Sequence, residues 1–564
     1  MKKIFLLFFI TLFIWSCNKN INNTIHYTIS PVNENNKTLL KLKMNFKASA
    51  DGETILLYQD KGWGQDSLHN TLSALKLLNT EATITKQRDS GWIIINHPKG
   101  LKELEFEYTL KQDTKGDLTT RKTYRPIVTP EYFHVFAHNL LMLPKHIVRP
   151  EKSTFNVTVS WEGFPKDYQI VNSFGSNEKT QLIEDIKEEE IHSAVFVGGD
   201  FRVHNINIKN KNVVFAIRGD WEVFADSTML NILKKTVRSQ RDLWQDHTQD
   251  YFAITMIPTI QKRGSGFQGT GLTQSFAVNA TNNKNLEVKG LVYLFNHELQ
   301  HNWTGSTIKN DNEEEQYWFS EGFTDYYTLK NITKSKVNDL DASYFISEFN
   351  TFVKELYISP AKNMANSELT YETFWSGKEG VQKLPYRRGA LLAFYLDNKI
   401  KHDSNGKKNL DNVLLEFKND AINKDQKITH PYFIETVNKY LKDDIKSFFN
   451  THIEDGKLYD YAQIFNEFDY EFNPTVKVFD LGFEFSEDRK KVKSIDETSN
   501  AYKAGLRAGD KLTQISYYRS TQYEAEFTIM RNKKEIEVKY LPAKDATVPQ
   551  LKNSSKNKEK IKAL

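Results

Sequence analysis

The stretch His297-Glu298-Leu299-Gln300-His301 decides how the central part of this 564-residue chain must fold. Residues four apart lie on one face of an α-helix, so both imidazoles can reach a single metal ion. Glu298 follows the first histidine and leans over the open position of that metal, where it can act as a general base. The pentapeptide therefore predicts a helix that carries a Zn²⁺ site with an activated water.

A chance match is the competing explanation, because the chain holds 14 histidines. The surroundings favour a site. Residues 290–296 form an apolar run suited to a buried helix, and residues 317–327 form a second helical pattern. Glu321 lies on that second helix, twenty residues beyond His301, and can supply a third ligand. Three protein ligands and one water are typical of a catalytic zinc site.

Asp325 lies four residues after Glu321 and shares its predicted helical face. A carboxylate there can accept a hydrogen bond from the outer nitrogen of a ligand histidine, and we expect His297 to be its partner. The alternative is a solvated surface carboxylate, which is common on helices.

The pattern from His297 to Asp325 resembles that of the gluzincin metallopeptidases. Trp318-Phe-Ser-Glu-Gly-Phe-Thr-Asp-Tyr-Tyr327 is similar in particular to the glycyl aminopeptidase family, whose members commonly carry a PDZ domain. The alanyl aminopeptidases are close relatives. The resemblance implies a zinc peptidase that uses His297, His301 and Glu321 as ligands.

A second block, Tyr386-Arg-Arg-Gly389-Ala-Leu-Leu-Ala-Phe-Tyr-Leu396, is similar to a segment found in both families. In these families the tyrosine donates a hydrogen bond to the oxyanion of the tetrahedral intermediate, a role that falls here on Tyr386. Such a donor is typically worth ~3 kcal/mol of transition-state stabilisation. Simple packing at the start of a helix is the alternative for Tyr386.

The family's substrate-amine motif, Gly-Gly-Leu-Glu-His, falls here on residues 270–274. Gly271, Leu272 and Thr273 are the candidate substrate-binding residues. Thr273 stands where the family has the glutamate that pairs with a free α-ammonium. The loop between His301 and Glu321 is also shorter than in the glycyl aminopeptidases. The shorter loop implies a differently shaped substrate cleft, and the Thr273 substitution keeps endopeptidase action open.

The N-terminus has the form of a secretory signal, with two lysines followed by a short apolar run. Ile14-Trp15-Ser16-Cys17 resembles a bacterial lipobox, and Cys17 is the only cysteine of the chain. We therefore expect lipidation of Cys17 and anchoring in the bacterial cell envelope, on the periplasmic or cell-surface face. A buried core thiol is the alternative.

Composition sets further limits. The formal net charge is +4, which gives no electrostatic argument for a nucleic-acid partner. The hydrophobic content of 39% and the aromatic content of 13% are typical of a well-packed globular protein. A chain of 564 residues suggests several domains.

The hydrophobic patterns predict a multidomain α+β protein. We expect a signal peptide over 1–16, an N-terminal antiparallel β domain over 17–204, and a thermolysin-like, mainly α catalytic domain over 205–473. Residues 474–543 resemble a PDZ domain, and the lysine-rich residues 544–564 read as a flexible tail. The PDZ-like part would bind a peptide C-terminus or only pack against the catalytic domain.

These observations predict a lipid-anchored zinc metallopeptidase in which Glu298 is the general base and Tyr386 stabilises the oxyanion. Its partners would be a peptide or protein substrate and the membrane that Cys17 reaches. The alternative from another class is a non-catalytic envelope protein that uses the peptidase fold and the PDZ module to hold peptides.

Overall fold

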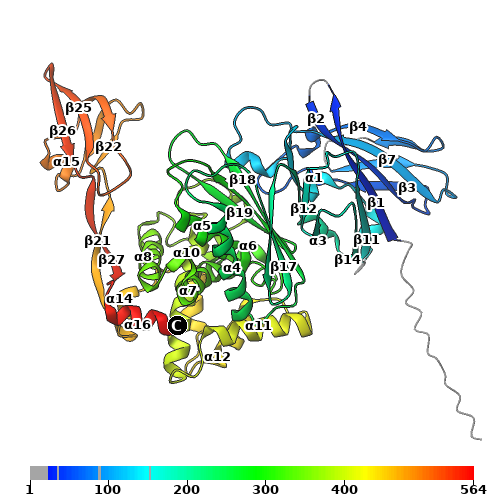
Figure 1. The fold of residues 1–564 in the computed structure, drawn as a ribbon. Helices are drawn as coiled ribbons and strands as arrows, with labels where there is room; N and C mark the ends of the chain where they lie inside the picture. Colours follow the sequence, from blue (N-terminus) through cyan, green and yellow to red (C-terminus); the bar gives the residue numbers. More distant parts are fainter. Residues whose placement is uncertain (1–22, 35–36, 87–90, 151–153) are drawn as a thin grey trace, which may run out of the picture. The chain divides into compact units, whose positions relative to one another are not determined.

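The computed structural model describes residues 23–34, 37–86, 91–150 and 154–564, so the predicted signal segment and Cys17 lie outside the described residues. The chain divides into two compact units (Figure 1). The first comprises residues up to 230 together with 247–288, and the second comprises 231–246 together with 289–564. Within the described ranges, no helix combines the length and the apolar character needed to span a bilayer.

The first unit is built of β-sheets. Alternating burial along strands such as β2 (Lys37–Lys47) places leucines, Met44 and Phe46 in the core and lysines outside, as a half-buried strand requires. A six-stranded sheet has the order β14 (Thr180–Ile186), β11 (Phe155–Trp161), β1 (Thr24–Glu34), β2, β7 (Glu103–Leu110), β4 (Leu72–Leu77). Its strand pairs are antiparallel except β1 with β11, which is parallel.

Three further sheets complete this unit. The second has the order β10 (Leu143–Pro144), β3 (Glu53–Leu57), β6 (Trp92–Asn96), β5 (Thr83–Lys86). The third has the order β13 (Gly175–Ser176), β12 (Gln169–Asn172), β15 (Val195–Gly199), β9 (Tyr132–Phe136), β8 (Ile127–Val128). The fourth has the order β16 (Arg202–Ile208), β17 (Lys211–Ile217), β18 (Tyr251–Thr259), β20 (Ser275–Thr281), β19 (Phe267–Leu272), with β18 parallel to both of its neighbours.

The predicted boundary at residue 204 falls inside β16. That strand forms an antiparallel hairpin with β17, in which His204 pairs with Phe215, so a break there would separate two hydrogen-bonded strands. The segment predicted as one catalytic domain, 205–473, is shared between the two units.

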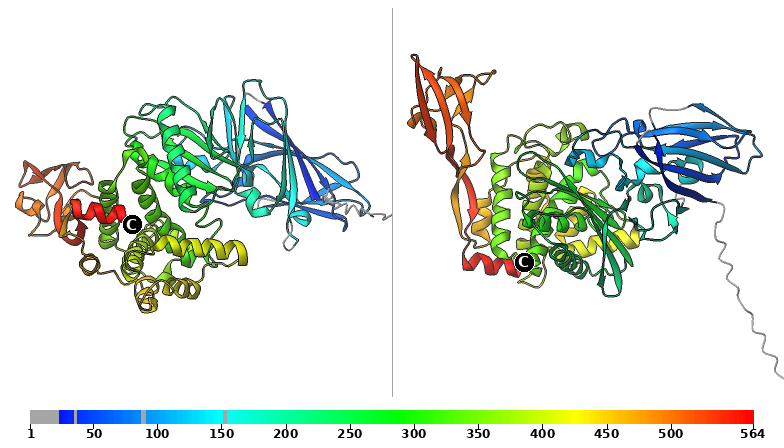
Figure 2. Two further views of the ribbon diagram at one scale, coloured as in Figure 1. Left: turned by 60° about the horizontal axis from the view of Figure 1, so that its bottom comes forward. Right: turned by 45° about the horizontal axis from the view of Figure 1, so that its top comes forward.

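The second unit is mainly helical in its first part (Figure 2). Helix α4 (Asp226–Leu243) runs into it from the first unit, and α5 starts at the last residue of the first unit. The longer helices are α5 (Val288–Gln300), α7 (Thr324–Ser335), α8 (Ala342–Ile358), α10 (Leu384–Asp403), α11 (Leu410–Lys424) and α12 (His430–Asn438). Sixteen of the twenty residues of α10 are buried, so this helix forms the centre of the helical part.

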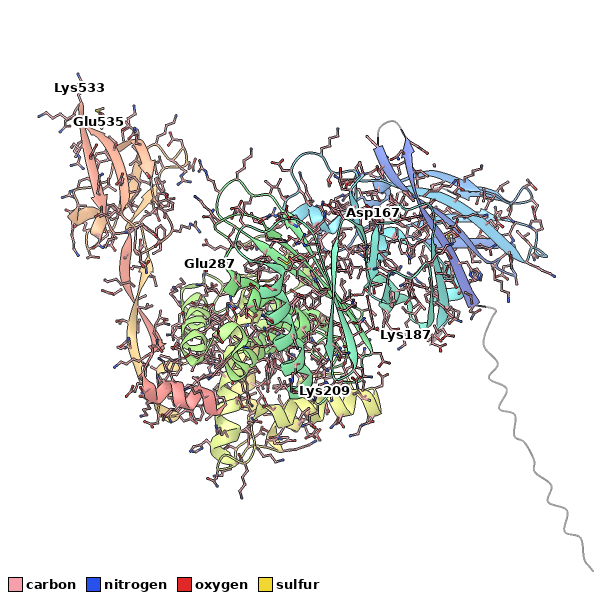
Figure 3. All side chains as sticks on the ribbon, viewed as in Figure 1. Asp167, Lys187, Lys209, Glu287, Lys533 and Glu535 are labelled. Atoms are coloured by element: carbon pink, nitrogen blue, oxygen red, sulfur yellow. The ribbon has the colours of Figure 1, made fainter. Side chains whose placement is uncertain are left out.

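A small β module follows the helices. It contains β22 (Phe483–Phe485), β23 (Val492–Ile495), α15 (Asn500–Lys503), β24 (Lys511–Ser516), β25 (Ala525–Arg531) and β26 (Lys534–Tyr540). A core of its own includes Leu506, Phe527 and Val538. Lys533 of the β25–β26 turn and Glu535 at the start of β26 lie at the tip of the module (Figure 3). The identity of this module as a PDZ domain stays a prediction.

The predicted flexible tail is wrong. Strand β27 (Ala543–Leu551) pairs along its length with β21 (Phe472–Phe479), and α16 (Ser555–Ala563) packs beside α8. Asn350 of α8 clamps the end of β27, with its Oδ1 accepting from the Leu551 amide at 2.7 Å. Four widely spaced apolar residues, Val548, Leu551, Ile561 and Leu564, are buried. Composition alone missed them because lysines dominate the exposed face.

Candidate metal centre

Helix α5 brings the two histidines together. His297 lies in its last turn and His301 directly follows its last residue. Their Nε2 atoms are 3.2 Å apart. The opposite side of α5 is fixed by buried amides, since Gln240 of α4 donates to the Asn296 carbonyl at 2.6 Å and Asn331 of α7 donates to Asn296 Oδ1 at 2.7 Å.

Glu321 completes the cluster from a π-helical turn, η4 (Trp318–Phe323), that leads into α7. Its Oε2 lies 3.3 Å from His297 Nε2 and 3.6 Å from His301 Nε2. Neighbouring ligands of a tetrahedral zinc ion are about 3.3 Å apart, given zinc–ligand distances of about 2.0–2.1 Å. Among the described residues this is the one group of three or more such side chains that can hold a metal ion.

The Nδ1 atoms of both imidazoles are already hydrogen-bonded. This leaves the two Nε2 atoms, which face the centre of the cluster, to bind a metal. His301 Nδ1 lies 3.1 Å from the Thr304 carbonyl, and His297 Nδ1 lies 3.0 Å from Asp325 Oδ1. Protons on the two Nδ1 atoms leave the Nε2 lone pairs facing each other and the carboxylate. Such a donor set requires a cation, and neutral imidazole with carboxylate is a ligand set that zinc prefers.

The electrostatic surroundings of His297 also favour a bound cation. Burial opposes the charged imidazolium, but hydrogen bonds and negative charge from Asp325 and Glu321 outweigh it and raise the pKa of His297 to about 10. A site that attracts a proton this strongly also attracts a divalent cation, which displaces that proton when it binds.

Asp325 lies in the first turn of α7 and is almost fully buried. Besides His297, it accepts a short hydrogen bond from the Tyr293 hydroxyl and a charged one from Arg387 Nη1 at 2.5 Å. Burial favours the neutral acid, yet the His297 hydrogen bond and the Arg387 charge outweigh it and lower the pKa of Asp325 to about 2. This carboxylate is therefore ionised and held from three sides, not solvated.

Glu298 and Tyr386 lie beside the cluster. Glu298 is 8% exposed, and the Tyr386 ring is stacked on the His297 ring with centroids 6.2 Å apart. Burial raises the pKa of Tyr386 well above its usual value, and the charges of Glu321, Asp325 and Glu298 raise it further. The phenol therefore keeps its proton and remains a hydrogen-bond donor.

Two glycines set the distance between the Glu321 and Tyr386 segments. A Cβ on Gly389 of α10 would lie 1.7 Å from the Trp318 carbonyl oxygen, and one on Gly322 would lie 2.4 Å from the Gly389 Cα. The backbones of η4 and α10 are therefore in direct contact, which only glycine permits.

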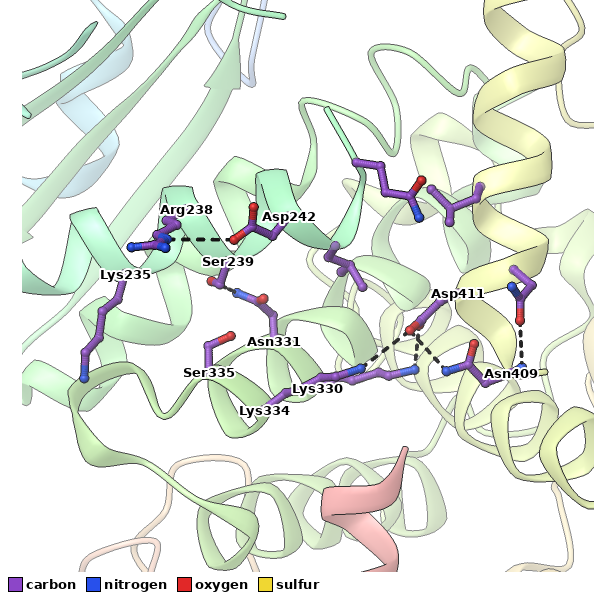
Figure 4. A pocket seen from close by; sticks show the side chains of 14 residues that line it. Lys235, Arg238, Ser239, Asp242, Lys330, Asn331, Lys334, Ser335, Asn409 and Asp411 are labelled. Carbon is purple, nitrogen blue, oxygen red and sulfur yellow. Dashed lines mark hydrogen bonds and ion pairs between the residues drawn. The ribbon is translucent and has the colours of Figure 1, made fainter. Parts of the chain in front are cut away.

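A buried ionic network holds α7 through residues 326–330, and Figure 4 shows the pairing of Lys330 with Asp411. Lys330 donates to Asp397 of α10 at 2.7 Å and to Asp411 of α11 at 2.6 Å. Tyr326 and Tyr327 donate to the same two carboxylates. The helix that carries Asp325 is thus tied to both neighbouring helices, so the metal ligands have a rigid support.

Sequence reasoning missed Arg387 and Tyr293, the further partners of Asp325. Arg387 also donates to Glu355 of α8 at 2.6 Å, which completes a chain of contacts from α8 to His297. Its place next to Tyr386 was a signal, but its partners lie 32 and 62 residues away in the sequence.

The candidate substrate residues belong to the first unit. Gly271 and Leu272 end the edge strand β19, and Thr273 begins the turn into β20. Thr273 Oγ1 donates to the Glu190 carbonyl at 2.7 Å, and its amide donates to the Ser193 carbonyl at 2.6 Å. The hydroxyl is thus used within its own unit, and the edge strand leaves backbone groups available for a peptide.

Comparison with known families agrees with this geometry. Residues 269–452 match the peptidase family M1 domain. The matched segment contains His297, Glu298, His301, Glu321 and Tyr386. Residues 269–452 are thus similar to an M1 peptidase domain, and zinc is the cofactor of the site that they hold. The finer resemblance to the glycyl aminopeptidases stays a prediction.

One solved structure shares the fold over nearly the whole chain. The chain is similar to an aminopeptidase N family protein from Idiomarina loihiensis, with 15% identity, a TM-score of 0.72, and coverage of 95% of this chain and 99% of that one. It also matches an M1 zinc metallopeptidase from Deinococcus radiodurans with 13% identity, a TM-score of 0.47, and coverage of 77% and 94%. No curated protein matches the sequence.

Proposed function

We propose that this protein hydrolyses peptide bonds at the zinc site formed by His297, His301 and Glu321. The observation that carries the proposal is the convergence of two imidazole Nε2 atoms and one carboxylate beside buried Glu298. Bound zinc supplies a water of lowered pKa and polarises the scissile carbonyl.

The protein's own groups move the protons and balance the charge. Glu298 accepts the proton of the attacking water and returns it to the leaving amine. Tyr386, neutral because of its raised pKa, donates a hydrogen bond to the developing oxyanion. Asp325 keeps His297 in the tautomer that presents Nε2. No covalent intermediate forms.

Aminopeptidase action is the finer proposal, supported by the resemblance of the motifs to the aminopeptidase families. Thr273 makes the preference for a substrate with a free N-terminal amine weak, because a hydroxyl carries no charge to pair with the substrate ammonium. Endopeptidase action on peptides with blocked N-termini is therefore part of the proposal.

We also propose that Cys17 is lipidated and that the protein is anchored in the cell envelope. The lipobox-like residues 14–17 support this location. The module from β22 to β26 is proposed to be a PDZ domain that takes a peptide C-terminus at a sheet edge.

The non-catalytic alternative is not favoured. A pure peptide-binding protein has no need for a buried general base, three converging ligands and an ionised Asp325, and this chain keeps all of them.

Glu298→Gln tests the mechanism. The variant should bind zinc normally and lose at least ~10³-fold in peptidase rate, because the base is not a ligand. Zinc content and peptide cleavage should be measured together, with the exposed Glu315→Gln as the matched control. Near-normal cleavage by Glu298→Gln would refute the assignment of the base.

A further inference from the structure

A cavity of about 660 Å³ lies inside the second unit, between the β21–β27 ribbon and the helices α8 and α10. Much of its wall is apolar and comes from Leu356, Pro360, Leu384, Val478, Phe479 and Ala546. The ribbon is fixed to α8, because Asn350 of α8 and Leu551 of β27 exchange hydrogen bonds in both directions.

Two residues connect this cavity with the zinc site. Lys383 lines the cavity, and its ammonium lies 5.0 Å from the centroid of the Tyr386 ring. Arg387 also lines the cavity, and its guanidinium holds Asp325, the partner of His297. Two residues of the cavity lining thus contact residues that surround the metal site, Lys383 through Tyr386 and Arg387 through Asp325.

The charges of the cavity favour an anion. Its lining contains four cations, Lys383, Arg387, Arg519 and Lys544, and two carboxylates, Glu355 and Glu379. Three of the cations are already paired: Arg387 with Glu355 and Asp325, Arg519 with Glu379, and Lys544 with Asp480. Within the described part of the chain, Lys383 forms no ion pair, and its contact with Tyr386 leaves its three donors for a ligand.

We propose that this cavity binds the C-terminal end of the peptide substrate, with Lys383 pairing with the terminal carboxylate and the apolar wall holding the last side chain. The inference rests on the proposed function, and it adds the substrate class: short peptides with a free C-terminus and an apolar last residue.

The other end of a peptide does not fit this place. Arg387 is already balanced by Asp325 and Glu355, so Lys383 sets the sign: an α-ammonium would meet it with like charge, whereas a carboxylate meets it with opposite charge. Each residue adds at most ~3.3–3.6 Å of extended chain. Because Lys383 lies against Tyr386, one or two residues beyond the scissile bond bring the carboxylate to its ammonium.

The charge is tested with pairs of tripeptides that differ only in a C-terminal carboxylate or carboxamide. Wild-type zinc-loaded protein should show a kcat/KM about tenfold higher for the acid, and raised salt should reduce this ratio. Lys383→Gln should bring the ratio close to one. Lys378→Gln, an exposed lysine on the same loop that does not line the cavity, should keep the wild-type ratio.

The apolar wall is tested with Ala546→Phe, which fills the cavity from β27 without changing its charge. Tripeptide acids that end in leucine should lose about tenfold in kcat/KM relative to those that end in glycine. An unchanged leucine-to-glycine ratio would show that the last side chain lies elsewhere and would overturn the inference.

The failure of the inference and that of the proposed function have different signatures. Cleavage of acid and amide at equal rates by wild type overturns the C-terminal site and leaves peptide hydrolysis intact. If neither peptide is cleaved, the proposed function fails. Calorimetric binding of the tripeptide acid and amide to zinc-loaded Glu298→Gln protein then tests the C-terminal site by itself. Tighter binding of acid than amide that Lys383→Gln abolishes supports it, and equal binding rejects it.

Discussion

Replacing Asp325 with asparagine removes one negative charge behind His297 and the acceptor for Arg387, whereas the amide oxygen can still accept the His297 hydrogen bond. The fold lowers the pKa of Asp325 to about 2, so the folded protein prefers the charged form. This preference corresponds to about 2–3 kcal/mol. Arg387 and His297 share this energy, so we expect zinc affinity to fall about 10–100-fold.

The pH dependence follows with a defined sign. Since the pKa of Asp325 is lowered on folding, its contribution is fully present above about pH 4 and is lost as the pH falls toward 2. Asp325→Asn should therefore narrow the gap in stability between pH 5 and pH 2 relative to wild type.

Zinc competition with a chromogenic chelator at neutral pH measures the affinity, and chemical unfolding at both pH values measures the stability. The control is Asp339→Asn, whose side chain is 99% exposed shortly after α7. Equal zinc affinity for wild type and Asp325→Asn would show that His297 is oriented by something else, and would refute the reasoning.

Three further predictions concern the fold, the substrate and the location. Gly389→Ala should destabilise the protein by several kcal/mol and reduce its zinc affinity, because the new Cβ would overlap the Trp318 carbonyl oxygen. A melting curve and a zinc content like those of wild type would contradict the close contact. N-acetylated peptides should be cleaved within about tenfold of the rate for free-amine peptides, a difference of ~1.4 kcal/mol or less, and strong selectivity for free amines would assign a carboxylate other than position 273 to that role. Cys17→Ser should abolish labelling by a fatty-acid analogue in cells, and a wild-type protein that takes up no label would not be a lipoprotein.

Local patterns made much of the site predictable. His297, Glu298 and His301 fall within five residues, and Glu321 with Asp325 repeats the spacing of one helical turn, so helix geometry alone brings them onto shared faces. Arg387 and Tyr293 were beyond this reasoning. Their contact with Asp325 depends on how three helices pack, and no local pattern encodes that packing.

In the fold, too, local patterns were predictable from the sequence and long-range contacts were not. Alternating hydrophobic residues predicted the N-terminal strands, but not that β1 pairs in parallel with β11, because pairing direction is a long-range property. The last 21 residues were misread because composition averages over a segment. Burial depends instead on whether single apolar side chains pack against β21 and the helices. Four of them do so: Val548, Leu551, Ile561 and Leu564.

The contact between Gly322 and Gly389 has a consequence for anyone who transfers this site to another scaffold. Contacts between side chains adjust, because rotamers can change by small steps, whereas two touching backbones act as a fixed spacer with no adjustable part. The distance between the segments that carry Glu321 and Tyr386 is thus fixed by main-chain atoms. Grafting the ligands and the tyrosine without this pair of glycines would reproduce the side chains of the site but not its dimensions.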